Sequence, residues 1–125
     1  RTDRGWFTMN KYLQSTTHEN IFGAGDCIEI SEYPDTPKSG VYAVREGPIL
    51  IHNLKQYLKR NDKDNDSMEF KEYVPQSDFL RLLNTGDDKG IGCKHGISFK
   101  GAWVWKLKDW IDVAWMNKFK VDTLL

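Results

Sequence analysis

The chain has 125 residues, enough for one domain with a modest hydrophobic core. Its 18 basic residues balance its 18 acidic residues, so overall charge gives no argument for nucleic acid or an anionic membrane as a partner. Cys27 and Cys93 lack the C-x-x-C spacing of a redox motif or a zinc ribbon, and no apolar run is long enough to span a bilayer. We expect an intracellular, cytoplasmic protein, with a mitochondrial or membrane-peripheral location left open.

The first elements in chain order are two predicted strands, at Gly5–Met9 and at Ile21-Phe22. The second strand stops in a turn of small residues, Gly23-Ala24-Gly25-Asp26, which holds the first two glycines of the G-x-G-x-x-G finger. The position of the third glycine holds Ile28, and no helix follows directly, so the first pyrophosphate finger is not predicted. The sequence instead places a carboxylate, Asp26, at the C-terminal end of a strand, where ligands bind in α/β sheets.

A loop with two prolines leads to a helix that is predicted from about Val41 to Leu58. Ser39 or Gly40 can cap this helix, and its apolar residues recur at helical spacing. Pro48 lies inside the run and predicts a kink or a local widening, because proline lacks a backbone donor.

The most polar stretch, KRNDKDNDSMEFKEY, follows the helix. Asp62, Asp64 and Asp66 alternate as the ligands of an EF-hand loop do, but Ser67 occupies the glycine position and Tyr73 the position of the final glutamate. We therefore expect a solvated, metal-free linker rather than a calcium site.

This linker divides the predicted chain into a first domain of residues 1–61, a linker of residues 62–72 and a second domain of residues 73–125. In the second domain, strands near Phe79–Asn84, Ile91–Lys94 and Ile97–Lys100 predict a small antiparallel meander. Cys93 and His95 form no larger ligand cluster, so we interpret them as alternate strand residues rather than as a metal site.

The last predicted element is an amphipathic helix, Trp103–Phe119, which holds four of the five tryptophans. At 100° per residue, one arc collects Trp103, Val104, Leu107, Trp110, Ile111, Ala114 and Trp115. We favour packing of this arc on the meander as core. The alternative is a helix that docks on a partner or a membrane surface, as tryptophan beside lysine would suit.

The segment HENIFGAGDCIEI, with the later PKSGVYAVREGPILIHNL, resembles the second FAD-binding segment of the pyridine nucleotide-disulphide oxidoreductase superfamily. There a strand ends in Gly-Asp, and a loop leads to a helix that opens with small and apolar residues. Type II NADH dehydrogenases share this pattern. The tail GAWVWKLKDWIDVAWMNKF is similar to a narrower branch, the oxidoreductases fused ahead of selenide, water dikinase, through Trp-x-Trp-x-x-Lys-Asp-x-Ile-Asp.

The resemblance implies an α/β to α+β fold. The C-terminal remnant of an FAD-binding Rossmann-like domain would precede a small antiparallel β-meander with a C-terminal amphipathic helix. It also implies that Asp26 accepts hydrogen bonds from an FAD ribityl hydroxyl or lies by the pyrophosphate, and that Gly25 allows close approach. Val41 and Tyr42 would touch the flavin ring, and the start of their helix would stabilise negative charge on reduced flavin. No catalytic residue and no metal ligand is implied within this chain.

The parent protein implied by the resemblance is an FAD-dependent NAD(P)H oxidoreductase. Its first FAD finger and its NAD(P)H domain would lie upstream of Arg1 and act as partners of this chain, which alone would be inactive and would self-associate through its first half. The rival interpretation is a non-catalytic interaction or membrane-surface module that uses the tryptophan-rich helix. The sequence leaves open the electron acceptor, the choice between NADH and NADPH, and the fusion to selenide, water dikinase.

Overall fold

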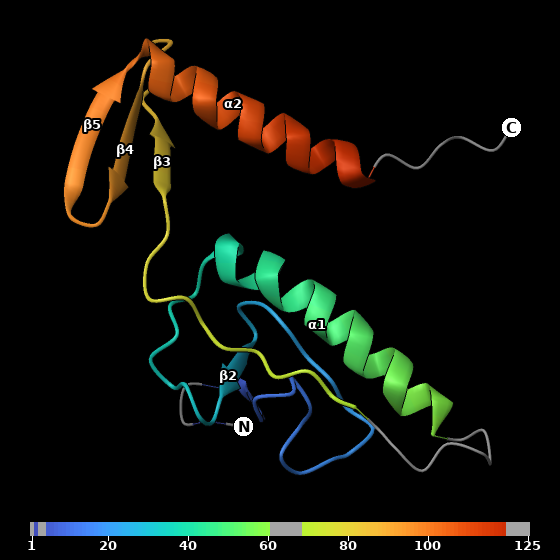
Figure 1. Ribbon diagram of the computed structural model, residues 1–125. Coiled ribbons are helices and arrows are strands. Elements are labelled where there is room, and N and C mark those ends of the chain that lie inside the picture. The colour runs from blue at the N-terminus through green and yellow to red at the C-terminus, as the bar shows by residue number, and fades with distance from the viewer. Residues whose placement is uncertain (1, 3–4, 61–68, 120–125) are drawn as a thin grey trace, which may run out of the picture. The chain divides into compact units, whose positions relative to one another are not determined.

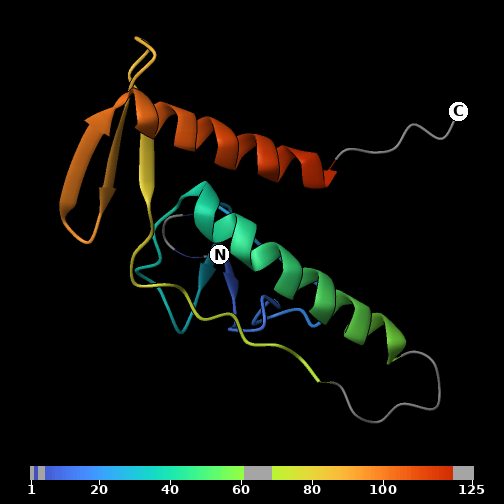
Figure 2. The ribbon, with the colours of Figure 1, turned by 45° about the horizontal axis from the view of Figure 1, so that its top comes forward.

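The computed structural model describes residues 2, 5–60 and 69–119. It forms two compact units, Arg1–Gln76 and Ser77–Leu125, and each is described here by itself. Each unit joins short strands to one long helix, as Figures 1 and 2 show, so the mixed α+β class expected from the sequence is confirmed.

The first unit contains the parallel strands β1 (Phe7–Met9) and β2 (Ile28–Ile30) and helix α1 (Gly40–Lys59). Phe7 pairs with Ile28 and Met9 with Ile30. Burial alternates along β2, as expected of a strand with one face in the core: Ile28 and Ile30 are buried, and Glu29 between them is only partly buried. Helix α1 continues through Pro48, and its predicted bounds are confirmed within one residue at each end.

The core of this unit gathers side chains from both strands, one loop and a later segment. Its buried members are Met9, Leu13, Ile28, Ile30 and Tyr73. Ile49 and Leu50 of α1 pack against them. A helix and two three-residue strands therefore share one core with residues that come after the helix.

Residues 69–76, which come after helix α1 in the chain, belong to the first unit. The backbone N–H of Tyr73 donates to the carbonyl of Lys11 at 2.8 Å, and Tyr73 is one of the core residues. The compact units thus divide between Gln76 and Ser77, later than the predicted start of the second domain at residue 73. Most of the predicted linker, with Asp62, Asp64 and Asp66, lies outside the described residues.

The strand predicted at Ile21-Phe22 is wrong. Phe22 makes only an isolated bridge with Gln14, and the strand that pairs with β1 is β2, six residues further on. The Phe22 ring instead packs edge-on against Tyr57 of α1 and against Phe70, at 5.4 and 6.2 Å between centroids. This aromatic packing holds Phe22 beneath the helix rather than in the sheet.

Asp26 lies before a strand rather than after one. The Gly-Asp turn precedes β2, so Asp26 stands before the N-terminal end of that strand and not after the C-terminal end of one. The argument that Asp26 lies in a crevice outside strand C-termini is therefore wrong.

The second unit is an antiparallel meander followed by a helix. Its strands are β3 (Arg81–Asn84), β4 (Gly90–Lys94) and β5 (Ile97–Gly101), in the order β3-β4-β5. This confirms the predicted meander. Gly92 is buried opposite Phe99, and a Cβ atom on Gly92 would lie 2.1 Å from that ring, so only glycine leaves room for it. The Phe99 ring in turn stacks on Trp103 at 5.2 Å.

Helix α2 (Ala102–Met116) continues into a short 3₁₀ turn, Asn117–Phe119. Only Val104 of the predicted apolar arc is fully buried, while Trp103, Trp110, Ile111 and Ala114 are exposed. The prediction that the whole arc forms core is therefore wrong. Helix α2 starts at the end of the small meander and runs away from it, as Figure 1 shows, so the strands do not cover the full length of the apolar arc. No helix among the described residues is long and apolar enough to cross a membrane.

Candidate functional site

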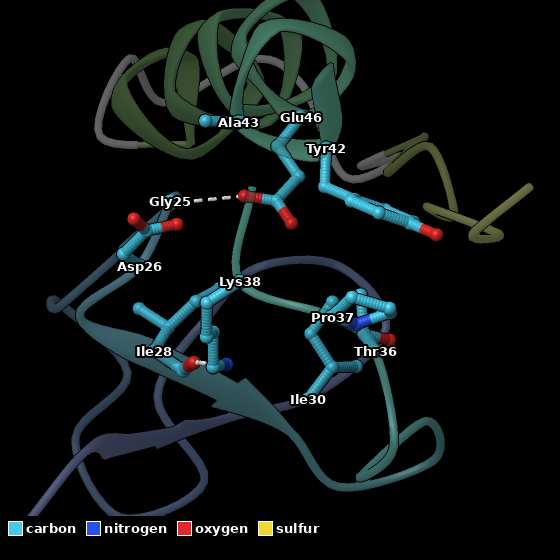
Figure 3. A pocket seen from close by; sticks show the side chains of 10 residues that line it. All are labelled: Gly25, Asp26, Ile28, Ile30, Thr36, Pro37, Lys38, Tyr42, Ala43 and Glu46. Carbon is cyan, nitrogen blue, oxygen red and sulfur yellow. Dashed lines mark hydrogen bonds between the residues drawn. The ribbon is translucent and has the colours of Figure 1, made fainter. Parts of the chain in front are cut away.

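A small cavity with a mixed polar and apolar lining lies in the first unit, where the Gly-Asp turn meets the start of α1. Its volume is about 10 Å³, room for about one water molecule, so it is too small to hold a ligand. Figure 3 shows the side chains that line it. They are Gly25, Asp26, Ile28, Ile30, Thr36, Pro37, Lys38, Tyr42, Ala43 and Glu46.

The turn is fixed to the helix by one hydrogen bond. The backbone N–H of Gly25 donates to Oε2 of Glu46 at 2.5 Å, the contact drawn as a dashed line in Figure 3. Gly25 has φ +81°, a left-handed conformation that favours glycine. Gly23 allows close packing, because a Cβ atom there would lie 2.8 Å from Ile28 and 2.9 Å from Met9.

Glu46 is a buried carboxyl group, with only 3 % of its surface exposed. Burial raises the pKa of this carboxyl above its ordinary value, and the negative charge of Asp26 acts in the same direction. The Gly25 N–H and the Lys38 ammonium oppose that shift by stabilising the ionised form. The cavity thus has one buried acid whose ionisation is coupled to an exposed carboxylate and a cation.

Lys38 reaches across the cavity floor toward β2. Its Nζ donates to the carbonyl oxygen of Ile28 and lies 4.3 Å from the centroid of the Trp6 ring. The ammonium group is therefore held by the first unit itself, next to the Gly-Asp turn.

Helix α1 begins beside the turn with its positive end uncompensated by side chains. Ser39 occupies the N-cap position without a side-chain capping bond, and the first turn contains no acidic residue. Such a helix start attracts negative charge, because its first N–H groups have no partner within the helix.

The structure brings three of the four predicted cofactor residues to one cavity. Gly25, Asp26 and Tyr42 line it, and Asp26 is exposed. Tyr42 is buried, and its hydroxyl donates to the carbonyl of Gln76 at 3.5 Å. Val41 is partly buried and does not line the cavity.

Sequence reasoning missed Glu46 and Lys38 as members of this site. Glu46 follows Tyr42 by four residues, which places both on one face of a helix, and that spacing was the available signal. Lys38 carries no such signal, because its contact with Ile28 depends on how the proline loop folds back.

The described residues contain neither a disulfide nor a cluster of metal-binding side chains. Cys27 is exposed beside Asp26, and its thiol donates to the carbonyl of Ala24 at 3.5 Å. Within residues 5–60 and 69–119, no group of three His, Cys, Asp or Glu side chains could hold a metal ion.

The backbone N–H of His95 donates to Oδ2 of Asp78 at 2.8 Å, and the ring Nδ1 of His95 lies 3.2 Å from the same oxygen. This contact closes the turn between β4 and β5 and links it to the segment before β3.

Comparison with known proteins gives one recurrent match. The chain is 30% identical over 92 residues to ferroptosis suppressor protein 1 of Xenopus laevis, and 29% identical over 92 residues to the proteins of that name from Taeniopygia guttata and Xenopus tropicalis. The matched residues cover 74% of this chain but 21% of each relative, so the chain spans about a fifth of their length. No family model matches the chain.

Proposed function

We propose that this chain is the C-terminal part of an FAD-dependent NAD(P)H oxidoreductase and supplies the second contact to FAD. The similarity to ferroptosis suppressor protein 1 supports an oxidoreductase in the coarse sense. The observation that carries the finer assignment is the meeting of the Gly25-Asp26 turn with the start of α1 at one cavity.

The residues at this cavity suit an extended, hydroxylated and anionic cofactor. The exposed Asp26 carboxylate accepts hydrogen bonds from ribityl hydroxyls, and the left-handed Gly25 lets a ligand approach the backbone. The uncapped start of α1 favours a site of negative charge, such as the pyrimidine edge of a reduced flavin. Tyr42 packs beneath this contact.

The cavity is too small to enclose any part of FAD. On this proposal the cofactor lies against the residues around the cavity. The other side of its site comes from a first FAD finger and an NAD(P)H domain elsewhere in the parent protein. FAD supplies the chemistry when bound, by accepting hydride from the nicotinamide. The chain's own residues bind and orient it.

The test compares two aspartates in the full-length protein that carries this chain. Asp26→Ala is expected to weaken FAD binding by about 1–3 kcal/mol, the range for hydrogen bonds to a charged group. Asp109→Ala removes an exposed carboxylate of the second unit and is the matched control. Unchanged flavin content in Asp26→Ala would remove Asp26 from the site.

A second candidate function rests on the exposed apolar stripe of α2. Trp103, Trp110 and Val113 are exposed and recur at spacings of seven and three residues, which places them on one helix face. This stripe suits a partner or a membrane surface. Anionic liposomes distinguish the two ideas, since a surface-binding helix shows a blue shift of tryptophan emission and sediments with the vesicles, whereas a chain that only contributes to the flavin site does neither.

The resemblance to the branch fused to selenide, water dikinase stays a prediction. An intracellular location and self-association of the isolated chain are proposals of the same kind.

A further inference from the structure

The first unit buries two polar side chains, Glu46 and Asn53, among its described residues. Asn53 has a structural role, since its amide forms hydrogen bonds with the backbone of Tyr12 and Lys71. Glu46 is different, because its one recorded hydrogen bond reaches 21 residues back to the Gly-Asp turn. Burying a carboxyl group costs free energy, so its place here calls for a reason beyond packing.

Helix α1 holds Gly25 through Glu46 and has the small side chain of Ala43 beside it. Glu46 accepts the Gly25 N–H at 2.5 Å, and the Cβ of Ala43 would lie 3.6 Å from a Cβ placed on Gly25. Residues three apart lie on the same helix face, so the face of α1 that bonds the turn is also the face next to Gly25 at Ala43.

Asp26 is the next residue and depends on this grip. Its side chain is exposed and forms no hydrogen bond within the described residues, so the backbone held at Gly25 is what fixes the position from which its carboxylate extends. Figure 3 shows the Glu46 carboxyl directed from α1 at Gly25, with Asp26 beside it.

Four charged or titratable side chains surround Glu46, and they come from four parts of the first unit. Asp26 lies on the turn, Lys38 on the loop before α1, Tyr42 on α1 itself and Tyr73 on the segment after it. Glu46 therefore accepts the Gly25 N–H while Asp26 and Lys38 act on its ionisation in opposite directions. A substitution can remove the charge of Glu46 and keep its hydrogen-bond acceptor.

We propose that Glu46 is a positioning residue of the flavin site, which sets the place of the Asp26 carboxylate through the Gly25 N–H. This rests on the proposed function. Glu46 itself touches no ligand. Its contribution to FAD binding passes through Asp26 and vanishes when Asp26 has no carboxylate to place.

Two nearly isosteric substitutions separate the acceptor from the charge. Glu46→Gln keeps an oxygen that can accept the Gly25 N–H, whereas Glu46→Met keeps the length and removes the acceptor. In the full-length protein, stripped of flavin and titrated with FAD, Glu46→Met is expected to weaken binding about tenfold, the loss of roughly one well-placed hydrogen bond. Glu46→Gln is expected to restore most of that affinity.

A double-mutant cycle with Asp26→Ala tests the route. If Glu46 acts through Asp26, Glu46→Met adds no further loss in the Asp26→Ala background, because contacting residues in one network are not additive. A purely structural role would instead weaken FAD equally in both backgrounds and overturn the inference.

The outcomes keep the two proposals apart. If Asp26→Ala weakens FAD while Glu46→Met binds it as the wild type does, the positioning role is refuted and the flavin site stands. If Asp26→Ala leaves FAD affinity unchanged, the proposed function fails, and the positioning role fails with it. Urea unfolding of each variant checks folding. If Glu46→Met does not fold, Glu46→Asp takes its place in the cycle, since its shorter side chain falls short of the Gly25 N–H.

Discussion

Replacing Asn53 by alanine removes the clamp that joins α1 to two separate segments of the first unit. Asn53 Nδ2 donates to the carbonyls of Tyr12 and Lys71 at 2.8 and 2.9 Å, and its Oδ1 accepts the Lys71 N–H at 2.8 Å. The side chain is completely buried, with 0% of its surface exposed. A single residue therefore bonds three backbone groups from two separate segments.

The magnitude follows from those three bonds. At about 1 kcal/mol of net stability each, the loss of these three bonds costs about 3 kcal/mol. A domain of this size has about 5–15 kcal/mol in all, so much of the stability of the first unit should disappear.

Urea unfolding of the 125-residue chain, followed by circular dichroism, measures this loss. Lys55→Ala is the control, because Lys55 is exposed on the same helix and its removal should stay within about 0.5 kcal/mol of the wild type. Limited proteolysis should also cut residues 69–76 faster in Asn53→Ala. A free energy of unfolding equal to that of the control would refute the clamp.

Three further outcomes are expected. The pKa of the Glu46 carboxyl is raised in the folded state, so Glu46 contributes its full stability below pH 4.5, the ordinary pKa, and loses it as pH rises through the folded-state pKa. The free energy of unfolding of the wild type should therefore fall relative to that of Glu46→Gln over this pH range. Parallel curves for the two proteins would contradict this. Gly92→Ala forces the Phe99 ring away from Trp103 and should cost about 1–3 kcal/mol, with altered near-ultraviolet circular dichroism, whereas an unchanged spectrum would show that the ring has room. Trp110→Ala should change the free energy of unfolding by less than about 0.5 kcal/mol, because the ring is 68% exposed, and a loss of several kcal/mol would place it in a core.

Periodicity predicted the long elements well. The helical spacing from Val41 to Leu58 and the turn signals at His95-Gly96 both describe local properties, and α1, β4 and β5 form where these patterns lie. The strand at Ile21-Phe22 failed because two apolar residues fit a strand or an aromatic cluster equally well. The choice depends on Tyr57 and Phe70, which are distant in sequence.

The candidate site was predictable only in part for the same reason. Gly25 and Asp26 follow from a local motif, but the bond from Gly25 to Glu46 joins residues 21 positions apart. The arc of α2 failed for another reason. Helical periodicity identifies an apolar face, but it does not say whether the helix lies along the sheet or runs away from it, as α2 does in Figure 1.

The central claim is that the Gly25-Asp26 turn and the start of α1 form part of a flavin site. The most direct measurement is FAD affinity of the full-length protein, wild type against Asp26→Ala, with Asp109→Ala as the control. We expect the control to bind FAD as the wild type does, and Asp26→Ala to bind it about 5- to 150-fold more weakly, the equivalent of about 1–3 kcal/mol. Equal FAD affinity in all three proteins would contradict it.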